Sequence, residues 1–164
     1  MNWYLIIRFL HIFSSIVFIG GILARQVIRS QGKKSGDINT LVAYFSAAGK
    51  IESLMVIPGN FATILFGVIF AVMIKAPIFG FLQGADKNWL LLTNVLLVLG
   101  SLNVPLVFLP RGKMYEKLLT DAIQKGEVTL ELKTHLDDKL VKAAHQFEIL
   151  MLVVIVLLMV FKPF

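Results

Sequence analysis

The sequence predicts an all-α membrane protein that crosses the bilayer with four helices in an antiparallel bundle. Of its 164 residues, 57% are hydrophobic and 16% are charged, whereas a soluble domain carries about 25% charged residues. The hydrophobic residues are gathered into long blocks, and most lysines and arginines lie between the blocks. Because each block can cross a membrane only as a helix, we expect a single transmembrane domain over residues 1–164.

Four blocks are long enough to span the membrane, since about 20 mostly apolar residues cross its hydrocarbon core. The first is interrupted only by Arg8 and His11, and the second and third carry no charge. The uncharged core of the fourth block is too short, so this span must recruit residues back to about Ala143. His145 and Glu148 then lie at one membrane edge or just inside it. The predicted spans cover residues 3–24, 53–74, 88–110 and 143–162.

The distribution of basic residues predicts the orientation. The connections 25–52 and 111–142 share one side and hold twelve of the 16 lysines and arginines, whereas only Lys75, Lys87 and Lys162 face the other side. Because such residues concentrate in cytoplasmic loops, we expect both connections to be cytoplasmic and both termini to lie outside a bacterial inner membrane. No basic residue precedes the first block, so we expect no cleaved signal peptide.

Both connections have helical patterns. Asp37 can cap a helix that continues into the second span until Pro58 kinks it. In the second connection one apolar stripe ends at Gly126, and another leads into the last span, which predicts a cytoplasmic amphipathic hairpin. The stripes are Met114, Leu118, Leu119, Ala122 and Ile123, then Leu132, Leu136, Leu140 and Ala144. His135, between Glu131 and Asp138, is expected to be solvated.

His11 is the most unusual residue of the first span. Counted from Trp3 at about 1.5 Å of rise per residue, its ring lies near the middle of the hydrocarbon, where a titratable side chain is rare and marks a candidate functional site. It shares a helix face with Arg25, close to the notch left by Gly21. A haem or metal ligand, a proton-relay group, and a simple hydrogen bond between helices are the alternatives.

A second set of polar residues is expected at matched depth in the cytoplasmic half of the bundle. Asn60, Asn103 and Glu148 each lie roughly 8–12 Å inside that face by the same rise, and His145 is one turn from Glu148. Such a layer can bind a ligand, relay protons, or hold the helices together. A carboxylate at this depth must be protonated, paired or in contact with water.

The patterns LHIFSSIVFIGGILARQVI and MVIPGNFATILFGV resemble a bacterial family of small four-helix membrane proteins. The chain looks most like an uncharacterised family of the superfamily that includes the copper-resistance-D proteins and the haem-containing HemJ-type protoporphyrinogen oxidases. The resemblance implies haem binding by His11. Thr93 and Asn103 stand where the HemJ-type third span has a lysine and a histidine, so protoporphyrinogen oxidation is not expected.

Three functions remain open. The first is a haem b protein of membrane electron transfer or haem-linked redox chemistry, with Arg8 or Arg25 near the propionates and Met151 as a second axial ligand. The second is a proton-coupled transporter of a small solute or of copper, which would use His11 and Glu148 and work as a homodimer. The third is an accessory subunit without catalytic activity. No phosphate-binding or dinucleotide motif is present, and we expect the lipid bilayer, not nucleic acid, as the surrounding partner.

Overall fold

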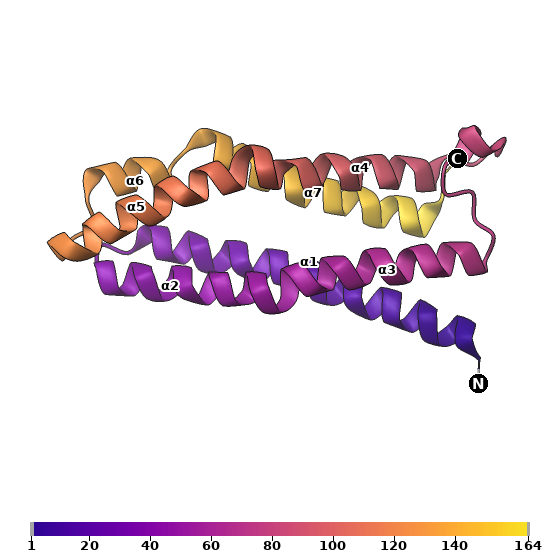
Figure 1. Cartoon of the computed structure of the whole chain (residues 1–164), viewed down its shortest axis with the longest axis horizontal. Coiled ribbons are helices and arrows are strands. Elements are labelled where there is room, and N and C mark those ends of the chain that lie inside the picture. Colours follow the sequence, from indigo (N-terminus) through magenta and orange to yellow (C-terminus); the bar gives the residue numbers. More distant parts are fainter. Residues whose placement is uncertain (1, 164) are drawn as a thin grey trace. The chain divides into compact units, whose positions relative to one another are not determined.

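The computed structural model describes residues 2–163, and every regular element in that range is helical (Figure 1). The prediction of an all-α chain with four helices of membrane-crossing length is confirmed, since four apolar stretches are long enough: Trp3–Lys34, Ile38–Met73, Trp89–Lys125 and Leu130–Phe161. The individual α-helices are α1 (Trp3–Lys34), α2 (Ile38–Ile51), α3 (Ile57–Met73), α4 (Trp89–Asn103), α5 (Leu109–Lys125), α6 (Leu130–Leu136) and α7 (Lys139–Phe161).

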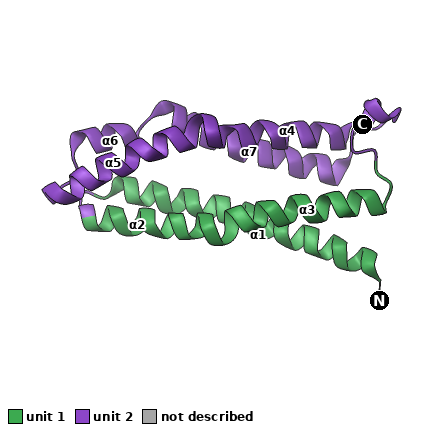
Figure 2. Cartoon of the chain, in the orientation of Figure 1, with its two compact units in different colours: residues 1–35, 39–76 green, residues 36–38, 77–164 purple. Residues whose placement is uncertain are grey.

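The chain divides into two compact units, each of which is a helical hairpin (Figure 2). The first unit is built from α1 and the continuous helix formed by α2 and α3, and comprises Met1–Ser35 and Asn39–Ala76. The second is built from α4 to α7, and comprises Gly36–Ile38 and Pro77–Phe164. The packing of both hairpins into one bundle remains a prediction.

In the first unit, α1 runs antiparallel to α2 and α3, and glycines set the distance between the helices. A Cβ atom on Gly21 would lie 2.9 Å from Met55 Cβ, one on Gly59 would lie 3.0 Å from the backbone of Phe18, and one on Gly32 would lie 2.8 Å from Tyr44 Cβ. Small residues allow such close approach of membrane helices. The contacts extend the hairpin well past the predicted membrane edge at residue 24.

Prolines explain two irregular turns. A proline in a helix lacks the N–H donor and its ring collides with the carbonyl four residues earlier. The chain widens into a π-turn before each of two prolines: η1 (Glu52–Val56) precedes Pro58, and η3 (Val104–Phe108) precedes Pro110. The kink predicted at Pro58 is therefore a π-turn that keeps α2 and α3 continuous. Such turns weaken the regular hydrogen-bond ladder and occur frequently at functional sites.

In the second unit, α4 and its continuation α5 run antiparallel to α6 and α7 (Figure 1). Gly126 ends α5 in the left-handed conformation (φ 70°), and its N–H bonds the carbonyl of Ile123, as the sequence predicted. The second apolar stripe does not continue as one helix. Asp137 and Asp138 interrupt it, and the Asp138 carboxylate caps α7 by accepting from the N–H groups of Leu140 and Val141.

Asp138 also joins the two arms of this helical hairpin, because it links the N-terminus of α7 to α5. Its Oδ2 accepts a hydrogen bond from Arg111 Nε at 2.7 Å, and His135 Nε2 lies 3.0 Å from the Arg111 carbonyl oxygen. His135 is half-buried rather than fully solvated, because it contacts this backbone group. The Arg111 guanidinium, and then the N–H of Leu140, lower the pKa of Asp138 below its usual value of 3.8.

Two adjacent glycines of α1 provide a matched test of the helix packing. Gly21→Ala should destabilise the protein by about 1–3 kcal/mol, because the added methyl group overpacks the contact with Met55. Gly20 has open space at the equivalent position, so Gly20→Ala should stabilise by up to about 1 kcal/mol through helix propensity. Thermal or denaturant unfolding in mild detergent measures both. Equal effects would contradict the described packing of α1 on η1.

The Asp138 cap predicts acid sensitivity. Because its pKa is lowered in the folded state, the stabilisation is fully present above the usual carboxyl pKa and is lost as the pH falls through the folded-state value. The free energy of unfolding should therefore fall as the pH is lowered below the usual carboxyl value of 3.8, and Asp138→Asn should weaken this dependence while keeping a capping oxygen. The control is Asp137→Asn, whose side chain is 69% exposed and which should retain the acid dependence.

Candidate functional site

The His11 side chain is held between α1 and α3. Its Nδ1 lies 3.0 Å from the carbonyl oxygen of Thr63, and its ring stacks on Phe70 with 6.5 Å between centroids. A Cβ on Gly67 would lie 2.9 Å from His11 Cε1, so the imidazole fills the space that this glycine leaves. Of the alternatives for His11, the structure contains the hydrogen bond between helices, from α1 to the Thr63 carbonyl of α3. Nε2 is left without a hydrogen bond in the described structure.

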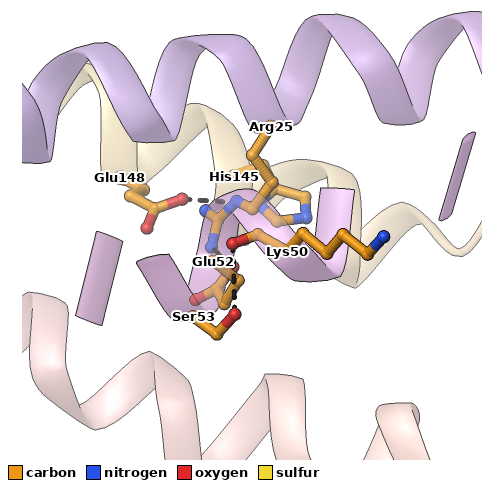
Figure 3. A network of polar contacts seen from close by, with 6 residues as sticks. All are labelled: Arg25, Lys50, Glu52, Ser53, His145 and Glu148. Atoms are coloured by element: carbon orange, nitrogen blue, oxygen red, sulfur yellow. Dashed lines mark hydrogen bonds and ion pairs between the residues drawn. The ribbon is translucent and has the colours of Figure 1, made fainter. Parts of the chain in front are cut away.

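Arg25 is bound by a carboxylate of its own unit. It lies two turns beyond Phe18 on α1, and its Nη1 donates to Glu52 Oε2 in the π-turn η1 (Figure 3). The Arg25 side chain is only 4% exposed, whereas Glu52 is 32% exposed. A buried guanidinium is tolerated in such a place because it is paired. Arg25 therefore serves first to join α1 to η1.

The other residues predicted to surround a haem have different environments. The notch at Gly21 is filled by Met55 and Val56 of η1, so this notch accepts a neighbouring helix rather than a flat ligand. Arg8 is exposed on α1. Asn60 is half-buried on α3, beside Gly59. Only His11 keeps an arrangement that could ligate iron, because a ligating histidine usually binds a backbone carbonyl with its other nitrogen.

The second unit contains an ionisable pair on α7. His145 Nδ1 lies 3.4 Å from Glu148 Oε2, one helical turn away, and each side chain is 16% exposed (Figure 3). The Phe108 ring, at the end of the π-turn η3, stacks on the imidazole with 4.8 Å between centroids and 24° between planes. Two titratable groups thus lie side by side at the start of an apolar helix, next to an irregular turn.

Asn103 falls at the level of this pair. Phe108 lies opposite His145, and Gly100 lies opposite Met151, whose Sδ would be 2.5 Å from a Cβ on that glycine. Since α4 and α7 run antiparallel, Asn103 comes between these two contacts, near Glu148. Its Nδ2 is buried and has no hydrogen-bond partner in the described structure. Met151 packs against α4 within its own unit, and its pairing with His11 remains a prediction.

Within residues 2–163, no group of three or more histidine, aspartate or glutamate side chains could hold a metal ion. A copper site made of three such side chains is therefore absent from these residues, and copper binding that involves His11 remains a prediction. For haem, His11 is a compatible single ligand, but Arg25 and the Gly21 notch are engaged by η1 and do not form a cradle for a porphyrin.

Sequence reasoning missed three participants. Glu52 was placed inside a connection, although a lone acid at the edge of an apolar block signals a partner such as Arg25. Phe108 looked like one apolar residue among many. The third, the Thr63 carbonyl, is a backbone group and leaves no trace in the residue types.

Residues 5–163 match the sequence model of a family described as predicted integral membrane protein (DUF2269). No curated protein matches the chain. No solved structure matches it either.

Proposed function

We propose that this chain, which belongs to the family of predicted integral membrane proteins (DUF2269), is a multi-pass protein of proton-coupled transport. The proton-binding site is the His145–Glu148 pair, and the cargo is a small solute or a metal ion. The match covers nearly the whole chain, and the four long apolar helices fit a multi-pass protein. The proposed location is the bacterial inner membrane, with the pair near the cytoplasmic face.

The observation that carries this proposal is the enclosed pair itself. A charged group in a membrane span is costly and marks ion or proton pathways. After Glu148, α7 continues without another charged residue to Phe161. A histidine and a carboxylate at 3.4 Å can together gain or lose one proton, and each change alters the net charge of the site by one unit. This change of charge would couple proton binding to a movement of the neighbouring helix segment η3.

The neighbouring π-turn supplies a place for movement. Phe108 belongs to η3 and covers one face of the His145 ring. Pro105 lies within the same turn, and Pro110 follows it, so this part of the helix lacks two N–H donors. Bending at η3 would shift Phe108 relative to His145 and change the access of water to the pair. A change of shape in η3 and a change of charge at the His145–Glu148 pair are therefore coupled through Phe108.

A haem b protein is the second candidate, because the Thr63 carbonyl holds His11 Nδ1 in the manner of a ligating histidine. The relation to the copper-resistance-D and HemJ-type proteins belongs to this candidate. The proton site does not require haem, and the two are distinguished by an absorption spectrum. A Soret band that is lost in His11→Ala would favour the haem candidate.

The test of the proton site uses protein reconstituted into liposomes that contain a pH-sensitive dye. After a pH jump, the wild type should carry protons faster than empty vesicles do, and Glu148→Gln should reduce the rate to that of empty vesicles. The matched control is Glu131→Gln, an exposed glutamate of α6 in the same unit, which should leave the rate unchanged. Equal rates for wild type and Glu148→Gln, or no rate above empty vesicles, would contradict the proposal.

A further inference from the structure

The segment between α3 and α4 folds back along α4. The carbonyl oxygen of Ile78 accepts a hydrogen bond from Asn94 Nδ2 at 3.0 Å. Asn94 lies five residues after the start of α4 at Trp89, which corresponds to about 7 Å along the helix. The loop therefore returns to a level inside the end of the apolar helix, instead of projecting away from it.

Part of the backbone of this loop is hydrogen-bonded within the loop and by its flanking side chains. Phe79 N–H donates to Gln83 Oε1, Phe81 N–H donates to Asn88 Oδ1, and the N–H groups of Gly80 and Leu82 donate to the carbonyls of Pro77 and Phe79. Four consecutive N–H groups are thus bonded by the loop or its flanking amide side chains. Backbone at membrane depth must satisfy its polar groups internally, and these four N–H groups meet that requirement.

Glycine makes this geometry possible. Gly80 has φ of 52°, and a Cβ there would lie 2.4 Å from Asn88 Oδ1. Gly84 ends the short 3₁₀ turn η2 (Gly80–Gln83) with φ of 70°. The loop is therefore built to hold one conformation.

This conformation presents large apolar side chains outward. Phe79 is 53% exposed, Phe81 is 64% exposed and Leu82 is 68% exposed. At the same end of the unit, Lys162 Nζ lies 5.4 Å from the centroid of the Trp89 ring, and Lys87 is exposed. The Trp89 ring is itself buried, whereas the two exposed lysines are typical of the membrane interface, where lysine meets lipid phosphates.

We propose that residues 77–88 form a re-entrant loop that inserts Phe79, Phe81 and Leu82 into the lipid leaflet opposite the two basic connections. The occupant of this apolar surface is the phospholipid bilayer. The loop lies at a membrane surface because it joins two spans. The hydrogen bonds from the side-chain amides of Asn88 and Asn94 hold the loop's apolar side chains at the depth of the first turns of α4. The loop anchors the second unit at a defined height in the membrane.

The protein contains no cysteine, so single cysteines can carry a nitroxide spin label without background. The test compares Leu82→Cys with Leu130→Cys, a leucine at the start of α6 that is 79% exposed and lies in the connection 111–142, which is expected to be cytoplasmic. Full-length protein is reconstituted into vesicles of phosphatidylcholine and phosphatidylglycerol. Collision of the label with oxygen reports lipid, and collision with a water-soluble nickel chelate reports water. The Leu82 label should show several-fold lower nickel accessibility and higher oxygen accessibility than the Leu130 label.

Two results would overturn the proposal. Nickel accessibility at Leu82 equal to that at Leu130 would place the loop in water. Low accessibility to both reagents at Leu82 would mean that protein, not lipid, covers it. A second variant tests the bond from α4: adding Asn94→Leu to Leu82→Cys should raise nickel accessibility toward the value for Leu130. No change would show that Asn94 does not set the depth of the loop.

Discussion

One constraint governs this molecule: at membrane depth, each polar group must find its partner within the chain. Helices satisfy most of the backbone, and the exceptions lie where the sequence breaks the helical ladder. The π-turns accommodate the prolines, and the amide side chains of Asn88 and Asn94 bond the loop before α4. The ionisable side chains follow the same rule, since Arg25 is paired with Glu52 and His145 with Glu148.

The sequence predicted the features that depend on composition and local spacing. The four apolar helices, the end of α5 at Gly126 and the proximity of His145 to Glu148 follow from block length, glycine at a helix end and a spacing of three residues. A proline predicted the break near residue 58, but not its form. The π-turn η1 packs closely against Gly21 of α1, a tertiary contact that local sequence does not predict.

Residue types alone could not predict the partners of the candidate site. His11 was a candidate ligand because a mid-membrane imidazole needs a partner, and a backbone carbonyl answers that need as well as a metal does. The haem hypothesis made Arg25 a candidate partner of a propionate, whereas the fold brings it to Glu52, 27 residues away in the sequence. Both cases have the same physical cause: a tertiary contact between antiparallel helices joins residues far apart in the sequence. Asn103 remains a buried donor without a partner among the described residues, which keeps the neighbourhood of Glu148 of interest for ligand binding.

The functional proposal combines a pair that can change charge with a turn that can change shape. Neither feature alone distinguishes a transporter from a structural helix bundle, because ion pairs and π-turns also serve packing. Their direct contact, through Phe108 stacked on His145, links the two. A structural pair would keep one protonation state, whereas a transport site must exchange its proton.

The most direct measurement is therefore an infrared difference spectrum of the bilayer-reconstituted protein, recorded as the pH is lowered. Proton uptake by a carboxylate gives a carbonyl band that shifts in heavy water. The account predicts such a band at Glu148, recognised by its loss in Glu148→Gln and its retention in Glu131→Gln. A spectrum that is unchanged by Glu148→Gln would mean that Glu148 does not take up a proton, and would contradict the account.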